Sequence, residues 1–409
     1  MNLHIHKSSI LNHPSEITIT GSKSETNRLL LLQALFPQIE INNLSDSDDS
    51  QVMQEALKTK SEVIDIHHAG TAMRFLTAYF AIQEHGEVIL TGSSRMKQRP
   101  IEVLVNALNS LGANISYLET KGCPPLKIQG SNLTKDKVTL NANVSSQYIS
   151  ALLLIAPKLK NGLELTLEGE ITSIPYINMT LALLEEIGVK TSFVDNKIKV
   201  LPMLEIPPLG FRGLVESDWS SASYWYSIVA LSDIGTKITL SSYKKNSLQA
   251  DAVLVDIYKN FGVETYFERN AIILTKTENK RLQHTYNLKD SPDIAQTIAV
   301  TCFGLGLGCH LTGLHTLKIK ETDRLEALKN ELTKLGAKVS VTNESLTLES
   351  SEKIKDNISI KTYQDHRMAM AFAPLALKRN LIIEDAMVVS KSYPSFWEDL
   401  KLVGFKISE

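Results

Sequence analysis

The chain has 409 residues, of which 45 are acidic, 43 are basic and 43% are hydrophobic. This length is enough for two domains with large cores, and the net charge of −2 provides no basic surface field of the kind that binds nucleic acid. Three cysteines are too few for a disulfide framework and are typical of a reducing compartment. Because no apolar leader or unbroken membrane-length apolar run is visible, we expect a cytoplasmic protein without nucleic-acid or membrane partners.

One pattern recurs along the chain: an amphipathic helix, then a glycine, then an alternating strand. A glycine directly after a helix often adopts the left-handed backbone conformation. A sixth helix is expected near residues 53–57, followed by a shortened segment between residues 57 and 67. Strands are predicted at 17–20, 88–91, 165–168, 238–241 and 311–312, each before a small polar loop. The recurring glycines are Gly112, Gly188, Gly262, Gly336 and Gly404, which lie 76, 74, 74 and 68 residues apart.

Six such repeats in two groups of three predict an α/β (α+β) protein with two similar domains. Three prolines at positions 202, 207 and 208 precede a plausible hinge near residue 215. If the two domains face each other, their strand-to-helix loops surround one cleft. The alternative is an extended solenoid, whose repeats are usually shorter than these.

Arginine is scarce in this chain, since 33 of the 43 basic residues are lysines. A guanidinium binds a carboxylate or phosphate through two parallel hydrogen bonds, which a lysine cannot reproduce. Ordinary surface salt bridges are one explanation for the arginines, but their clustering favours an anionic ligand. Six of the ten lie in short polar segments: Arg28, Arg74, Arg95, Arg99, Arg324 and Arg367.

Four polar segments in the first half of the chain could bind such an anion. Residues 21–28 precede a helix predicted over 29–35 and combine helix N-terminal amides with hydroxyls and cations. Within residues 68–76, Gly70 allows the backbone to approach a ligand closely. Residues 92–100 hold three cations in five positions, and the serines of residues 145–148 could cap a helix or bind phosphate. Each segment alone also fits a capped helix or an exposed basic loop.

Candidate acids follow in the second half. Asp293 precedes an apolar helix, where it could also be a simple cap, and Glu321 lies in the segment 320–324 that opens the next helix. Residues 365–370 open another helix and place a histidine beside an arginine. We therefore expect a cation-rich site in which Asp293 and Glu321 transfer protons between two anionic small molecules.

Metal and covalent chemistry are disfavoured by the sequence. Cys302, Cys309 and His310 lack the short cysteine spacing of a zinc site. Neither a nucleophile elbow nor a dinucleotide-binding fingerprint follows a predicted strand. We expect no metal and no cofactor.

Seven motifs, in order from residue 21 to the C-terminus, resemble the 5-enolpyruvylshikimate-3-phosphate synthase family of enolpyruvyl transferases. The resemblance implies two domains, each of three repeated βαβαββ-type units, with the active site in the interdomain cleft. It also implies that the N-terminal strand joins the C-terminal-type domain, which gives residues 1–20 plus 216–409 for that domain and 21–215 for the other. The motifs are Gly-Ser-Lys-Ser-x-Thr-Asn-Arg (21–28), Ala-Gly-Thr-Ala-Met-Arg (69–74), Arg-Met-x-x-Arg-Pro-Ile (95–101), Ser-Ser-Gln-Tyr (145–148), Lys-Glu-Thr-Asp-Arg-Leu (320–325), Asp-His-Arg-Met-Ala-Met (365–370) and Lys-Ser-Tyr-Pro (391–394).

This family transfers the enolpyruvyl group of phosphoenolpyruvate to the 5-hydroxyl of shikimate 3-phosphate, without metal or cofactor, in the shikimate pathway to chorismate and aromatic amino acids. The resemblance implies that Asp293, Glu321 and Lys23 are catalytic. It implies shikimate 3-phosphate contacts from Lys23, Ser24, Arg28, Ser145, Ser146, Gln147, Ser173, Asp293 and Lys320. The implied phosphoenolpyruvate contacts are Lys23, Gly70, Arg99, Gln147, Arg324, Arg367 and Lys391. We expect a monomer that acts on these two small molecules.

The chain departs from the family pattern at three places. His68 and Thr316 each replace an asparagine, the second of which contacts shikimate in the family, and the first repeat is short. One alternative function is UDP-N-acetylglucosamine enolpyruvyl transfer, but that relative has a reactive cysteine where this chain has residues 93–96. A non-catalytic anion-binding paralogue is the other, and the retained Asp293, Glu321 and Lys23 argue against it.

Overall fold

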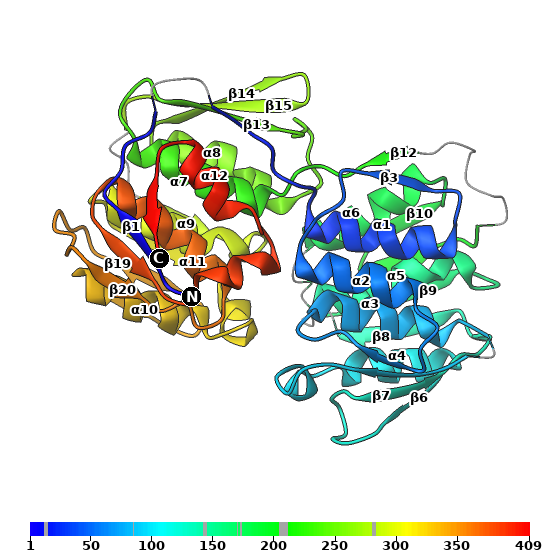
Figure 1. Cartoon of the computed structure of the whole chain (residues 1–409). Helices are drawn as coiled ribbons and strands as arrows, with labels where there is room; N and C mark the ends of the chain where they lie inside the picture. Colours follow the sequence, from blue (N-terminus) through cyan, green and yellow to red (C-terminus); the bar gives the residue numbers. More distant parts are fainter. Residues whose placement is uncertain are drawn as a thin grey trace. The chain divides into compact units, whose positions relative to one another are not determined.

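A computed structural model gives the fold (Figure 1) and describes residues 1–11, 15–84, 86–141, 145–169, 171, 174–203, 212–279 and 284–409. Contacts between residues divide the chain into two compact units. Unit 1 consists of Met1–Gly21 and Glu216–Glu409, and unit 2 consists of Ser22–Val215. Helices and strands alternate in both, so the predicted α/β class is confirmed. In the part of the chain that the structure describes, no helix has the length and apolar character needed to cross a membrane.

Among the residues that the structure describes, five four-stranded sheets share one connectivity. In each, two neighbouring strands are parallel, and the second of them continues into an antiparallel pair. Unit 2 contains β4 (Val63–Asp65), β5 (Glu87–Thr91), β7 (Leu126–Gln129) and β6 (Asn114–Tyr117) in one sheet, and β10 (Thr191–Val194), β11 (Lys197–Val200), β9 (Leu163–Glu168) and β8 (Lys137–Asn141) in another. Unit 1 contains β14 (Val263–Glu268), β15 (Ala271–Lys276), β13 (Lys237–Ser241) and β2 (Ser15–Ile17), then β16 (Thr285–Asn287), β17 (Cys309–Thr312), β19 (Leu346–Leu348) and β18 (Val339–Val341), and finally β20 (Ile358–Ile360), β21 (Leu381–Ile383), β1 (Leu3–His6) and β22 (Lys406–Ser408).

The remaining described sheet is a parallel pair, β3 (Glu40–Asn42) and β12 (Arg212–Leu214), in which Ile41 lies opposite Gly213. Helix α2 (Asp48–Lys58) follows β3 and leads directly to β4. The hairpin that follows α4 (Glu102–Leu111) and the second helices of the next three repeats is therefore missing between residues 58 and 63. This agrees with the shortened first repeat that the spacing predicts.

Two strands of unit 1 come from the extreme N-terminus. β2 lies beside β13, with Ile17 opposite Leu240, although α1 (Lys23–Leu35), the next helix along the chain, belongs to unit 2. β1 pairs with both β21 and β22, so His4 lies opposite Ser408 and the two chain ends meet (Figure 1). The last repeat ends at β22, and β1 occupies the position that the second hairpin strand holds in the other sheets.

Each unit is built around three buried helices. In unit 2, α1, α3 (Gly70–Ala81) and α5 (Ser146–Ile155) pack against one another, and in unit 1 so do α7 (Trp219–Leu231), α9 (Ala295–Gly304) and α11 (His366–Phe372). Most of their side chains are buried on every face, and in α9 and α11 nearly all are. A helix that is apolar all round belongs in a core. We call these six the inner helices.

The second helix of each repeat is amphipathic, and in every repeat but the first it is followed by one of the predicted glycines. The glycines that follow α4 (Glu102–Leu111) and α10 (Arg324–Leu335) have φ values of 113° and 105°. A residue with a Cβ is strained at such angles, which explains why glycine recurs there. The other members are α2, α6 (Ile174–Glu186), α8 (Leu254–Lys259) and α12 (Phe396–Leu402).

Candidate active site

The candidate residues gather at the N-termini of the inner helices. In unit 2, Lys23, Gly70 and Ser146 are the first residues of α1, α3 and α5. In unit 1, Asp293 lies in the short turn η4 (Pro292–Ile294) directly before α9, and Arg367 is the second residue of α11. The first N–H groups of a helix lack intrahelical partners and attract negative charge. Each unit therefore carries a set of anion-attracting helix ends.

Helix α1 begins at Lys23, six residues before the helix start predicted at Leu29. Ser24 and Arg28 thus lie within the helix and not in a preceding loop. The prediction was wrong because the polar side chains of the first two turns look like loop residues in the sequence. In the fold, Arg28 is only 2% exposed and its polar atoms find partners inside the unit.

Arg28 is held by residues far away in the sequence. Its Nε donates to Thr180 Oγ1 at 2.8 Å, and its Nη2 donates to Ser150 Oγ at 3.0 Å. Its Nη1 donates to the Ser24 carbonyl at 2.7 Å. Burial lowers the pKa of Arg28 to about 10, which still leaves the guanidinium charged at neutral pH. Arg28 therefore fixes α1 against α5 and α6 and brings a buried positive charge to the helix ends.

A second pair of arginines lies at the start of α3. A Cβ placed on Gly70 would lie 2.5 Å from Arg99 Nη1, so the guanidinium of Arg99 rests directly on the Gly70 backbone. Beneath it, Arg74 donates to the carbonyls of Gly70 at 3.1 Å and Pro100 at 3.0 Å. Burial, and next the charge of Arg99, lower the pKa of Arg74 to about 10. Two neighbouring guanidiniums make this place attractive to an anion.

The first turn of α5 lies against that of α3. Gln147 Nε2 donates to Thr71 Oγ1 at 3.2 Å, and Ser145 caps the helix by accepting the Gln147 N–H. Ser146 is buried beside them. At the start of α1, Lys23 Nζ lies 3.5 Å from Asp49 Oδ2. Ser173, the remaining candidate of this half, lies outside the described residues.

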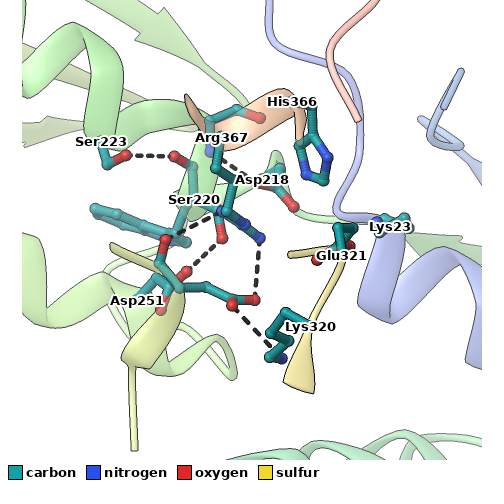
Figure 2. A network of polar contacts seen from close by, with 12 residues as sticks. Lys23, Asp218, Ser220, Ser223, Asp251, Lys320, Glu321, His366 and Arg367 are labelled. Atoms are coloured by element: carbon teal, nitrogen blue, oxygen red, sulfur yellow. Dashed lines mark hydrogen bonds and ion pairs between the residues drawn. The ribbon is translucent and has the colours of Figure 1, made fainter. Parts of the chain in front are cut away.

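In unit 1, Asp293 lies among three cations, two of which, Lys320 and Arg367, are labelled in Figure 2. Its Oδ1 accepts from Arg324 Nη1 at 2.9 Å and lies 3.6 Å from Lys320 Nζ. Its Oδ2 accepts from Arg367 Nη2 at 3.0 Å. Three opposite charges at these distances strongly favour the ionised carboxylate.

Arg324 is the centre of this network and is 1% exposed. Besides Asp293, it donates from Nε to Asp365 Oδ2 at 2.6 Å and from Nη2 to Glu321 Oε2 at 2.7 Å. Burial by itself would lower the pKa of Arg324, but the carboxylates of Asp365, Glu321 and Asp293 raise it overall. The guanidinium is therefore a permanent cation with a carboxylate on each of three sides.

Asp365 also organises the start of α11. It is fully buried, and its Oδ1 accepts the backbone N–H of Arg367 at 2.9 Å as the helix cap. Lys391 lies near the same helix, and its Nζ donates to the Gln364 carbonyl at 2.8 Å. Asp365 thereby couples the backbone that carries Arg367 to the side chain of Arg324.

The family model for EPSP synthase (3-phosphoshikimate 1-carboxyvinyltransferase) matches residues 54–400. The chain belongs to the EPSP synthase family. A relative from Bacteroides fragilis, named 3-phosphoshikimate 1-carboxyvinyltransferase, is 48% identical over 407 residues, which cover 97% of this chain and 98% of the relative. A relative of the same name from Vibrio campbellii is 35% identical and covers 95% and 96% of the two chains.

Solved structures match the EPSP synthase fold over the full chain. EPSP synthase from Acinetobacter baumannii superposes with a TM-score of 0.80 at 21% identity, covering 100% of both chains. The enolpyruvyl transferase NikO from Streptomyces tendae gives a TM-score of 0.74 at 14% identity, with 100% and 98% coverage. At these identities the likeness establishes the fold alone.

The structure brings most of the sequence-predicted residues of unit 1 into one network: Asp293, Lys320, Glu321, Arg324 and Arg367. Sequence reasoning gave Asp365 no role, although it lies in the motif with Arg367. It also missed Ser150 and Thr180, which hold Arg28, because no local pattern marks them. Only their distant partner in the fold reveals them.

Proposed function

We propose that this protein transfers the enolpyruvyl group of phosphoenolpyruvate to the 5-hydroxyl of shikimate 3-phosphate. The observation that carries the proposal is the network in which Asp293 and Glu321, two potential acid/base groups, share the cation Arg324. The reaction joins two anions and moves protons, so it needs fixed cations and carboxylates in one place.

The first step is an addition. The 5-hydroxyl loses its proton, the new C–O bond forms at C2 of phosphoenolpyruvate, and its methylene carbon gains a proton. In the second step phosphate leaves, the new methyl group loses a proton and the enol ether is formed. Asp293, which pairs with three cations, would remove the hydroxyl proton once substrate oxygens replace it on some of them. Glu321 pairs with Arg324 and has a side chain 34% exposed, and it suits delivery of the proton to carbon.

Substrate binding would also adjust these two acids. The carboxylate and phosphate of phosphoenolpyruvate compete with Asp293 and Glu321 for the N–H groups of Arg324 and Arg367. When substrate oxygens take over these hydrogen bonds, the two carboxylates lose positive charge nearby and gain proton affinity. In this way the anionic substrate would create the base that its own reaction needs.

In unit 2, the helix N-termini would bind the remaining anionic groups. We assign Ser145, Ser146 and Ser173 to the phosphate of shikimate 3-phosphate, with Ser24, Arg28, Gln147 and Lys320 as further contacts. Arg99, resting on Gly70, would contact phosphoenolpyruvate, together with Gln147 and Lys391. Lys23 would contact both substrates and assist the proton transfers.

Two departures from the family pattern affect binding and not chemistry. His68 Nδ1 lies 2.8 Å from Ser93 Oγ, so it braces the turn that precedes Arg99. Thr316 Oγ1 is buried and has no hydrogen-bond partner in the described part of the chain. It stands where the family uses an asparagine to contact shikimate. Because the threonine side chain is shorter than that of asparagine, we expect it to extend less far toward that substrate.

The UDP-N-acetylglucosamine reaction is not favoured, because the relatives reported above are named for the shikimate substrate. Cys123, Cys302 and Cys309 are free thiols, in keeping with a cytoplasmic enzyme. We propose that the enzyme is a monomer, which light scattering of the purified protein would test.

The deciding experiment is phosphate release from phosphoenolpyruvate with shikimate 3-phosphate. We expect turnover that is lost when either substrate is omitted and that UDP-N-acetylglucosamine does not replace. Binding of both ligands without phosphate release would instead identify a non-catalytic paralogue. Turnover with UDP-N-acetylglucosamine alone as acceptor would contradict the proposed substrate.

A further inference from the structure

Asp251 is a buried acid that has no part in the mechanism above. It lies in the turn η3 (Ala250–Val253), which packs against the first turn of α7, and it is 4% exposed. Ser220 Oγ donates a hydrogen bond to its Oδ2, and its Oδ1 has no hydrogen-bond partner among the residues that the structure describes. Ionising a buried carboxyl group that accepts only one hydrogen bond is unfavourable in free energy unless a nearby positive charge stabilises the carboxylate.

The charges that face Asp251 come from three other elements. Asp293 of η4 and Asp218, the cap of α7, are negative, and Arg367 of α11 is positive. Figure 2 shows Asp251 and Ser220 close together beside Arg367. Arg367 gives Nη2 to the Asp293 carboxylate at 3.0 Å and Nη1 to the Asp293 carbonyl at 3.3 Å, whereas its Nε is buried without a partner in the described chain. The charge of the Arg367 guanidinium thus acts on two acids, Asp293 through a hydrogen bond and Asp251 through space.

We propose that Asp251 is a positioning residue that controls, through Arg367, how strongly Asp293 binds a proton. This inference rests on the proposed function, in which Asp293 removes the hydroxyl proton. When Asp251 is ionised, its charge offsets Arg367 and makes Asp293 a stronger base. When Asp251 holds a proton, Arg367 acts fully on Asp293 and weakens it.

The negative charge of ionised Asp251 favours proton removal by Asp293 but opposes substrate binding. Ionised Asp251 reduces the positive field around Arg367 and so weakens binding of the phosphoenolpyruvate anion, while it favours catalysis at Asp293. Burial, and then the charge of Asp293, raise the pKa of Asp251 to about 7, so both states occur near neutral pH. As the pH rises and Asp251 ionises, the affinity for phosphoenolpyruvate should therefore fall while kcat increases.

The first test is the pH profile of the Asp251→Asn variant between pH 6 and pH 9. We expect kcat at pH 8 to fall about tenfold, the size of effect that one charge has on a nearby acid at an effective dielectric constant of about 20. The variant should lose the inflection of kcat near neutral pH, and its KM for phosphoenolpyruvate at pH 8 should not rise. Asp256→Asn, which removes an exposed carboxylate five residues away, is the matched control and should keep the normal profile.

A milder variant retains the carboxyl group. Ser220→Ala removes the hydrogen bond that favours the ionised form of Asp251, so the inflection should move to higher pH while the plateau of kcat is retained. An unchanged inflection in Ser220→Ala would overturn the proposal. So would a loss in Asp251→Asn that is equal at every pH, because a merely structural role predicts that result.

A spectroscopic test does not depend on activity. With ¹³C-labelled aspartate, infrared difference spectra should show a protonated carboxyl that ionises near pH 7 and is missing in Asp251→Asn. In Asp293→Asn, loss of the neighbouring negative charge should move this ionisation to lower pH. An unmoved midpoint would refute the coupling even if the protein has no enolpyruvyl transferase activity, and absence of activity with a shifted midpoint would contradict only the proposed function.

Discussion

The guanidinium of Arg99 lies against the backbone of Gly70, where a Cβ would be 2.5 Å from Nη1 and 2.9 Å from Nη2. Gly70 is the first residue of α3, so it joins a helix N-terminus to a cation from another segment. Because a Cβ carbon and a guanidinium nitrogen cannot approach so closely, Arg99 can occupy this position only because residue 70 is a glycine.

Gly70→Ala should therefore displace Arg99 and weaken phosphoenolpyruvate binding. Loss of one charged hydrogen bond costs about 1.5–3 kcal/mol, or one to two powers of ten in affinity. Calorimetric titration should show this loss for phosphoenolpyruvate and a much smaller one for shikimate 3-phosphate. Gly86→Ala is the control, because its nearest neighbour would be 3.7 Å away, an ordinary contact. Equal affinities in the two variants would remove Arg99 from the site.

Lysine substitutions test whether the arginines act as two-pronged anion ligands. Arg99→Lys and Arg367→Lys keep the charge and lose the planar fork, so each should weaken phosphoenolpyruvate binding by about ten- to a hundredfold. Arg95→Lys, in the same loop as Arg99 but exposed, should change it little. Equal and small losses for both substrates would indicate that the arginines are ordinary surface cations.

Substitution of Asp293 and Glu321, the two acids that share Arg324, tests their role in proton transfer. Glu321→Gln and Asp293→Asn should lower kcat by about 10²–10⁴ and change KM much less, since in the proposed mechanism each removes a group that acts in the transition state. Steady-state kinetics with both substrates measure the split. Glu326→Gln, an exposed acid that pairs with Lys329 in the same helix as Arg324, is the control for charge. Near-normal turnover would exclude the substituted residue from the mechanism.

Asp251 also makes the stability of the fold depend on pH. Its pKa is raised from 3.8 in an unfolded chain to about 7 in the fold. Unfolding therefore releases its proton between these values, and the free energy of unfolding falls as pH rises through that window. Asparagine cannot ionise, so the stability of Asp251→Asn relative to the wild type should increase by about 2–3 kcal/mol from pH 5 to pH 8. Urea denaturation at the two pH values measures this difference, and a constant difference would contradict it.

Local sequence determined the repeating helices and their ends. A helix followed by glycine needs only the periodicity of its own apolar residues and a left-handed residue after it, as at Gly112 and Gly336. The prediction of an anionic ligand also comes from the sequence alone, because arginines cluster in short polar segments against a lysine-rich background. Those features depend on neighbours within a few residues.

Only the tertiary structure decided where the buried polar groups lie. Arg28 donates a hydrogen bond to Thr180, 152 positions away in the sequence. Because such partners allow its polar side chain to be buried, the segment that looks like a loop in the sequence forms the first turns of α1. β1 joins β22 across the whole chain because the last sheet has three strands of its own. Asp251 meets the charge of Asp293 through the packing of two short turns on α7, and no spacing in the sequence marks that pair. A buried charge is stable only where distant elements supply its partners, so such positions follow from the packing of the complete fold.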